Sequence, residues 1–137
     1  MSDALFDTSV FIDWWKGSTG AVNLVDAVKD GRLTASYSSI TIAELWQWDQ
    51  LDRKEEIEYV ALTSRYLEEA SLGFEEARLA GTWLRGYGRN QRRKLFADAL
   101  IAATAQLRRE TVYSGNYRQL RHFYPDVQPY LTPAPAP

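Results

Sequence analysis

The sequence has no cysteine and a single histidine, His122. Without cysteine the chain can form no disulfide, thiolate nucleophile, iron–sulfur cluster or cysteine-ligated zinc site. One histidine leaves a single candidate base for a Ser-His-Asp triad and excludes metal sites built from several imidazoles. His122 lies beside Phe123 and Tyr124 near the end of the chain, which favours a structural or surface role. Carboxylates must therefore carry most of any chemistry.

Long apolar runs and a basic N-terminal segment are also missing. No run approaches the roughly 20 residues of a membrane-spanning helix, and the opening Met-Ser-Asp is unlike a secretion signal. We expect a cytoplasmic protein with no membrane contact. The length of 137 residues, with 45% hydrophobic and 25% charged residues, suits one folded domain. We assign residues 1–131 to this domain and expect the proline- and alanine-rich residues 132–137 to form a disordered tail.

The net charge of −2 hides a strong polarity along the chain. Residues 41–76 contain ten acidic and three basic side chains, whereas residues 77–121 contain ten basic side chains and two acids, Asp98 and Glu110. A basic segment can attract phosphates even in a mildly acidic protein, because charge acts locally within a Debye length of about 8 Å. The alternative is that these segments are two ordinary solvated faces.

Short apolar segments alternate with helical patterns along the chain. We expect strands over residues 4–12, 33–37, 70–72, 111–113 and 127–131, and helices over 22–28, 42–48, 53–67, 75–87 and 99–109. A basic loop over residues 89–94 is expected between the last two helices. This order predicts a three-layer α/β/α domain with a central, mostly parallel sheet, in which functional groups collect at the carboxyl ends of the strands.

Three acids stand out in apolar surroundings, namely Asp7, Glu44 and Asp98. Two of them also have structural interpretations. Thr41-x-x-Glu44 has the pattern of a capping box, and Asp98 precedes a helix expected from Ala99, as an N-cap would. Asp7 is harder to explain in this way, because a lone carboxylate is costly to bury unless a cation or several donors meet it.

Side chains near Asp7 could supply those donors. If the first strand continues past Asp7, its alternation places Ser9 on the same face and Thr8 on the opposite one. Ser114 and Asn116 follow another expected strand and would join the same site if the two strands are neighbours. An ordinary turn or helix start is the alternative for the segment from Ser114 to Gln119.

Convergence of Asp7, Glu44, Asp98 and Asn116 would create a site made only of oxygen ligands. Such a site selects Mg²⁺, with Mn²⁺ as the alternative, over zinc or copper. These ions activate water for attack on phosphorus, so the site predicts hydrolysis of a phosphodiester. The nearby basic residues would then contact a nucleic acid backbone: Arg85, Arg89, Arg92, Arg93 and Lys94.

Four segments resemble the motif blocks of PIN domains, in order and at suitable spacing. They are Leu5-Phe6-Asp7-Thr8-Ser9-Val10-Phe11-Ile12-Asp13, Thr41-Ile42-Ala43-Glu44-Leu45, Asp98-Ala99-Leu100-Ile101-Ala102-Ala103-Thr104-Ala105 and Val112-Tyr113-Ser114-Gly115-Asn116. The likeness is strongest to VapC-type toxins of bacterial toxin–antitoxin pairs and covers nearly the whole chain before the tail.

The resemblance implies a magnesium-dependent endoribonuclease with Asp7, Glu44 and Asp98 as its acidic cluster, Asn116 as a fourth site position and Ser9 as a supporting hydroxyl. It also implies a homodimer, and a small VapB-like antitoxin that forms a heterotetramer or larger complex and blocks the metal site. Proteins of the family usually have a further acid or histidine a few residues after the position of Asn116. This chain has Gln119 there, which favours one metal ion over two.

Two other functions remain alternatives at this stage. The chain could be a non-catalytic module of the same fold that binds RNA or protein, because the fourth acid is absent. A phosphotransfer enzyme with an aspartyl nucleophile is the second, although such enzymes often need an acid where Ser9 stands. The tryptophans Trp14, Trp15, Trp46 and Trp48 could stack on bases, but we expect them to fill the core and a protein interface.

Overall fold

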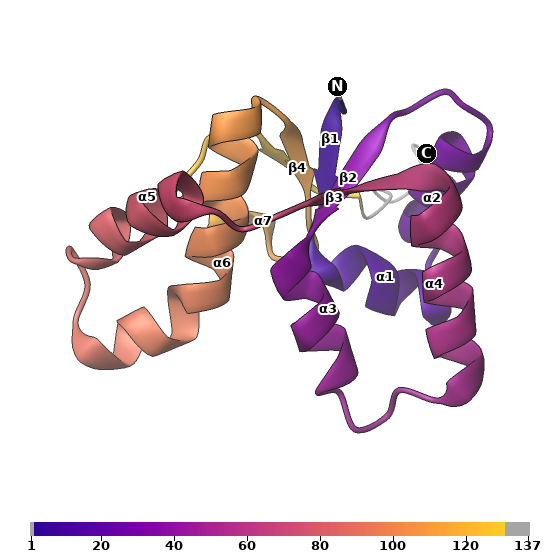
Figure 1. The fold of residues 1–137 in the computed structure, drawn as a ribbon, viewed down its shortest axis with the longest axis horizontal. Helices are drawn as coiled ribbons and strands as arrows, with labels where there is room; N and C mark the ends of the chain where they lie inside the picture. The colour runs from indigo at the N-terminus through magenta and orange to yellow at the C-terminus, as the bar shows by residue number, and fades with distance from the viewer. Residues whose placement is uncertain (1, 131–137) are drawn as a thin grey trace, which may run out of the picture.

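The computed structural model describes residues 2–130, and the tail predicted at 132–137 lies outside them. Within this range, five short strands form one sheet in the order β3-β2-β1-β4-β5, and every neighbouring pair is parallel (Figure 1). The strands are β1 Ala4–Phe6, β2 Ala35–Ser38, β3 Leu67–Ala70, β4 Thr111–Tyr113 and β5 Val127–Gln128. The parallel sheet predicted from the sequence is therefore confirmed.

Helices cover both faces of this sheet. They are α1 Thr8–Trp15, α2 Thr19–Lys29, α3 Ser39–Trp46, α4 Arg53–Tyr66, α5 Phe74–Leu84, α6 Arg89–Arg108 and α7 Tyr117–Leu120. Alternate residues of β1 serve the two sides: Leu5 packs with residues of α5, α6 and α7, whereas Ala4 and Phe6 pack with residues of α1, α2 and α4. Figure 1 shows the same division, which confirms the three-layer α/β/α architecture.

The first predicted strand is wrong after Phe6. The chain forms β1 over Ala4–Phe6, and Asp7 is then the N-cap of α1, with extended backbone angles of φ −68° and ψ 158°. Val10 and Phe11, which suggested a continued strand, are fully buried from the helix instead. Apolar content therefore marked this segment as buried, but burial alone does not distinguish a strand from a helix.

The predicted basic loop at residues 89–94 is also wrong, because these residues form the first turns of α6. Asp98 is consequently inside a 20-residue helix and is not an N-cap. Basic residues at a helix N-terminus oppose the helix dipole, so local sequence gave little sign of this helix. Packing overrides that preference, since Leu84 of α5 and Leu95 of α6 share one buried cluster.

Three smaller differences concern element boundaries. Ser38, whose hydroxyl accepts a hydrogen bond from Ile40 N–H at 3.2 Å, is the N-cap of α3, so the capping box predicted for Thr41 and Glu44 does not form. The third strand lies at Leu67–Ala70 instead of 70–72. The last strand is Val127–Gln128, while Leu131, the end of its predicted range, lies outside the described residues.

No helix within residues 2–130 combines the length and the apolar character that crossing a bilayer requires.

A buried ion pair ties α6 to the amino edge of the sheet. The Glu110 side chain is 1% exposed, accepts a hydrogen bond from the Ser36 hydroxyl at 2.7 Å, and receives Arg108 Nε at the same distance. Arg108 also contacts Glu68 at 3.2 Å. A buried carboxylate is tolerated only when its partners compensate for the hydration it has lost. We therefore expect the stability of the protein to depend on the contact of Arg108 with Glu110.

Replacing Arg108 by alanine should lower the free energy of unfolding by about 3 kcal/mol, because Glu110 would keep a buried charge without its cation. Urea denaturation followed by circular dichroism measures the change. Arg78→Ala is the matched control, since it removes an arginine whose pair with Glu75 is exposed; its midpoint should stay near that of the parent. Equal midpoints for the two variants would contradict this account of the buried pair.

Candidate active site

The site begins where two neighbouring strands end. Phe6 of β1 pairs with Tyr113 of β4, so the residues that follow them, Asp7 and Ser114, lie side by side at the carboxyl edge of the sheet. Both are buried. The Ser114 hydroxyl donates to Asp7 Oδ2 at 2.6 Å, and the Ser9 hydroxyl donates to the same oxygen at 3.1 Å. The contact between Ser9 and Asp7 matches the prediction, but it arises at the start of a helix and not along a strand.

Burial raises the pKa of the Asp7 carboxyl above its ordinary value. The hydroxyls of Ser114 and Ser9 and the backbone N–H groups of Thr8 and Ser9 act in the opposite direction, because they stabilise the ionised form. These donors hold the carboxylate in a fixed orientation, yet they do not fully replace the water it has lost. Asp7 is therefore a buried group that would gain from a nearby cation.

Glu44 reaches the same region from α3. The Thr8 hydroxyl donates to Glu44 Oε1 at 2.6 Å and lies 3.0 Å from the Thr41 hydroxyl. Thr8, expected to point away from the site, is thus a supporting residue, because α1 turns it towards α3. Partial burial raises the pKa of Glu44, the Thr8 hydroxyl lowers it, and the negative charge of Asp7 raises it.

Asp98 completes the acidic cluster from α6. Its pKa is raised from 3.8 to about 7, first by burial and then by the negative charges of Asp7 and Glu44. The fold thus brings carboxylates from three separate segments close enough for the charges of Asp7 and Glu44 to act on Asp98. Like charges gathered in a partly buried place repel one another, so the arrangement is costly unless protons or a cation neutralise it.

The chemistry of these ligands fits a hard divalent ion. All of them offer carboxylate oxygens, and no ion pair within residues 2–130 joins Asp7, Glu44 or Asp98 to a lysine or arginine. No three histidine, aspartate or glutamate side chains in that range form a cage that could hold a metal ion. Mg²⁺ does not require such a cage, because it usually keeps several waters and binds through one or two carboxylates and substrate phosphates.

Asn116 lies beside this cluster but is not joined to it through its side chain. Its backbone N–H donates to the Ser114 hydroxyl oxygen at 2.9 Å, while its amide is exposed and caps nothing in α7. Thus Ser114 Oγ lies between Asp7 and Asn116. The role predicted for the Asn116 amide within the acidic cluster remains a prediction.

The predicted nucleic-acid-binding residues are exposed on the arm formed by α5 and α6. Arg85 follows α5, and Arg89, Arg92, Arg93 and Lys94 occupy the first turns of α6 (Figure 1). None of them forms an ion pair with a residue of the described range 2–130. Lys94 is one helical turn before Asp98 and so shares its face of α6, whereas Arg89, Arg92 and Arg93 spread around the first turns of that helix.

Tyr130 and Asp13 were missed by the sequence analysis. The Tyr130 hydroxyl donates to Asp13 Oδ2, and Asp13 is one turn after Ser9 on α1. Gly115 N–H donates to Ser9 Oγ at 3.0 Å, and a Cβ on Gly115 would stand 3.1 Å from the Tyr130 hydroxyl. The missing side chain of Gly115 therefore allows this close approach. A separation of 117 residues between Tyr130 and Asp13 left no local signal for the contact.

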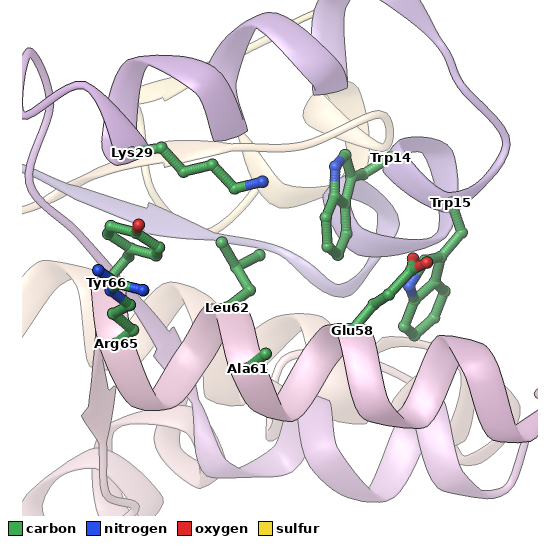
Figure 2. Close-up of a pocket in the computed structure, with 8 residues that line it drawn as sticks. All are labelled: Trp14, Trp15, Lys29, Glu58, Ala61, Leu62, Arg65 and Tyr66. Carbon is green, nitrogen blue, oxygen red and sulfur yellow. The ribbon is translucent and has the colours of Figure 1, made fainter.

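A further pocket lies away from Asp7, Glu44 and Asp98. It has a volume of about 540 Å³ and is lined by residues of α1, α2 and α4, as Figure 2 shows: Trp14, Trp15, Lys29, Glu58, Ala61, Leu62, Arg65 and Tyr66. Trp15 stacks between Trp14 and Trp48, with ring centroids 6.3 and 6.2 Å away. Its buried Nε1 has no hydrogen-bond partner within residues 2–130. Trp46 is 40% exposed, while Trp14 and Trp15 are partly buried and pack against the core cluster without being part of it, so the expectation that the tryptophans fill the core is not met.

A hollow of about 450 Å³ opens beside Glu44 and the Thr8 that supports it. Ile12, Gln47, Trp48 and Asp49 complete its lining. His122 is exposed. Glu44 borders this open surface, which a polymeric substrate could approach, whereas Asp7 and Asp98 are not among the residues that line it.

The fold is that of a known protein family. The sequence profile of the PIN domain matches residues 4–123, so the chain belongs to the PIN-domain family, as the resemblance in its sequence predicted. No curated protein matches the sequence significantly.

Several solved structures are similar to the chain. In a toxin–antitoxin complex from Klebsiella pneumoniae, the matching chain is 26% identical, with a TM-score of 0.69; the match covers 91% of this chain and 95% of that one. A chain of VapBC2 from Rickettsia felis, bound to a promoter DNA fragment, has 17% identity, a TM-score of 0.67 and coverage of 93% and 98%. A chain of DNA-bound VapBC from Salmonella typhimurium has 18% identity and a TM-score of 0.65, and the match covers 95% of this chain and 99% of that one.

Asp98→Asn should stabilise the protein in EDTA at pH 8 by about 1 to 2 kcal/mol and change it little at pH 4. The raised pKa of Asp98 means that the unfolding free energy falls as pH rises from about 4 to 7, with the full penalty above 7. Asparagine removes this penalty, and solvent screening of the partly exposed group keeps the gain modest. Urea denaturation at both pH values measures it. The exposed Asp26→Asn is the control; a loss of stability in Asp98→Asn at pH 8 would refute the electrostatic account.

Proposed function

We propose that the chain is a Mg²⁺-dependent endoribonuclease of the VapC type, the toxin of a toxin–antitoxin pair. The observation that carries this proposal is the acidic cluster of Asp7, Glu44 and Asp98. The negative charge of Asp7 raises the pKa of Glu44, both charges raise the pKa of Asp98, and none of the three forms an ion pair with a lysine or arginine within residues 2–130. Such a cluster is a poor way to stabilise a fold. It is a suitable way to hold a hard cation at the open edge of a sheet.

Asp7, Glu44 and Asp98 would hold the ion, with Mn²⁺ as an alternative to Mg²⁺. When bound, the ion would lower the pKa of water for attack on phosphorus and balance charge on the phosphate. The chain's own residues supply orientation. Ser9 and Ser114 fix Asp7 through its Oδ2 atom, and Thr8 fixes Glu44 through Oε1. Fixed oxygens need no reorganisation when the substrate arrives.

The choice of nucleic acid as substrate is supported by charge. The first turns of α6 are basic, and Asp98 follows Lys94 by four residues in the same helix. Cationic side chains and a carboxylate of the acidic cluster therefore lie on one helix. Phosphate groups would contact Arg85, Arg89, Arg92, Arg93 and Lys94 while a phosphodiester lies at the acids. RNA, rather than DNA, is proposed from the resemblance to VapC toxins.

An antitoxin is the proposed protein partner. The similar chain in the Klebsiella pneumoniae toxin–antitoxin complex supports it. Surface suitable for a protein partner is available at the Trp14–Trp15 pocket and at Trp46, Ile57 and Val60, which are 40 to 57% exposed. A homodimer that joins antitoxin in a heterotetramer or larger complex, as the sequence resemblance implies, belongs to the same proposal.

Purified chain, freed of any co-purifying protein, should cleave single-stranded RNA in Mg²⁺ or Mn²⁺ and should not do so in EDTA. Asp7→Asn should reduce the cleavage rate at least about 100-fold, because it removes a charged ligand from the centre of the site. Cleavage of a labelled oligoribonucleotide, resolved on a denaturing gel, measures this effect.

Asp26→Asn, which changes an exposed acid on α2, serves as the matched control and should retain full activity. Equal activity of the Asp7→Asn variant would refute the proposed site. Tight RNA binding without cleavage in either metal, and without a shift of Tm on adding the metal, would favour the alternative of a non-catalytic module.

A further inference from the structure

A separate hollow follows Ser114 along the chain. It has a volume of about 430 Å³ and is lined by the turn between β4 and α7 and by α7 itself: Gly115, Asn116, Tyr117, Arg118 and Gln119. Ser114, immediately before it, donates to Asp7 and accepts from Asn116 N–H. Ser114 therefore links the turn that lines this hollow to Asp7 of the acidic cluster, although the hollow contains no acid itself.

Two of the side chains that line it, Asn116 and Gln119, are neutral amides. Within residues 2–130, neither the Asn116 nor the Gln119 side chain donates or accepts a hydrogen bond, although the backbone of each is used in α7. An amide offers a donor and an acceptor side by side, which is the pattern presented by the edges of nucleic acid bases. Amides are poor competitors with carboxylates for Mg²⁺, so this end of the site is suited to recognition more than to metal binding.

An aromatic ring with a fixed position stands beside these amides. The Arg121 guanidinium donates twice to the Val127 carbonyl, at 3.0 and 2.8 Å, and its carbon lies 4.9 Å from the Tyr117 ring centroid. Arg118 is exposed and lies 5.7 Å from the same centroid. Unpaired RNA bases stack on aromatic rings and on guanidinium planes, and a nearby arginine can contact the adjoining phosphate.

We propose that this hollow binds one unpaired RNA base next to the phosphodiester at the acidic cluster. The amides of Asn116 and Gln119 contact the base edge and set sequence preference, while Tyr117 and Arg118 support the plane of the base. This inference rests on the proposed ribonuclease function, since it names the RNA feature that the same site selects. Paired bases are excluded, because their edges are occupied and their faces are stacked.

The test uses binding, so that it does not depend on cleavage. In EDTA, the Asp7→Asn chain is titrated into four labelled eight-nucleotide RNAs that contain uridine except at the fourth position, which is A, C, G or U. The expected Kd values spread over about 5- to 100-fold, the discrimination that one well-placed amide pair provides. Adding Gln119→Leu should reduce this spread to less than about twofold.

Two controls separate base recognition from general effects. Gln106→Leu removes an exposed amide at the far end of α6 and should keep the full spread. Arg118→Gln should weaken all four RNAs alike and lower the salt dependence of binding by about one phosphate contact. If Gln119→Leu lowers the Tm, Asn116→Ala at an exposed side chain provides the same test.

Equal binding of the four RNAs by the parent chain, or an unchanged spread in Gln119→Leu and Asn116→Ala, would overturn the inference. Failure of the proposed function is distinguishable from this result. A wild-type chain that cleaves no RNA, but whose base preference depends on Gln119, would refute the nuclease and leave the base site standing. A chain that cleaves RNA with no base preference would do the reverse.

Discussion

Electrostatic repulsion among Asp7, Glu44 and Asp98 is the constraint around which the rest of the site is organised. Parallel pairing of β1 with β4 makes Asp7 and Ser114 neighbours, and α3 and α6 bring the other two acids towards them. Hydroxyl and backbone donors reduce the cost of burying Asp7 without cancelling its charge. The arginines and lysines that could neutralise the cluster stay on the surface of the α5–α6 arm, so the negative potential at the edge is preserved for a cation or a proton.

The order and layers of the fold could be predicted from the sequence because apolar segments and turn residues report burial directly. Whether a buried segment forms a helix or a strand was harder to predict. Val10 and Phe11 are fully buried from α1, and a short run of such residues looks the same in either structure. The error had a consequence for the site, since a strand would have turned Thr8 away, whereas the helix directs its hydroxyl to Glu44. The grouping of acids survived this error, because it depends on chain topology more than on local side-chain direction.

Contacts between distant segments were the part that sequence alone could not supply. Tyr130 bonds to Asp13, and Glu110 is buried against Ser36, across separations of 117 and 74 residues. Neither pair has a characteristic spacing. The prediction of a loop at the start of α6 failed for another reason. Arg89, Arg92 and Arg93 disfavour a helix N-terminus locally, whereas the packing against α5 that outweighs this preference is a tertiary effect.

Ser114 connects the chemical and recognition ends of this edge. The Ser114 hydroxyl accepts a hydrogen bond from Asn116 N–H at 2.9 Å and donates one to Asp7 Oδ2 at 2.6 Å. A movement of the turn that carries Asn116 would therefore change the position of a hydrogen-bond donor on which Asp7 depends. Gly115 lies between Ser114 and Asn116 in the sequence, and its N–H donates a hydrogen bond to Ser9 Oγ. The Tyr130 hydroxyl lies close to the position that a side chain of residue 115 would take. A base seated beside Asn116 would therefore press on the same turn that orients Asp7. Through Ser114, binding of a base at the proposed site would be coupled to the orientation of the Asp7 carboxylate.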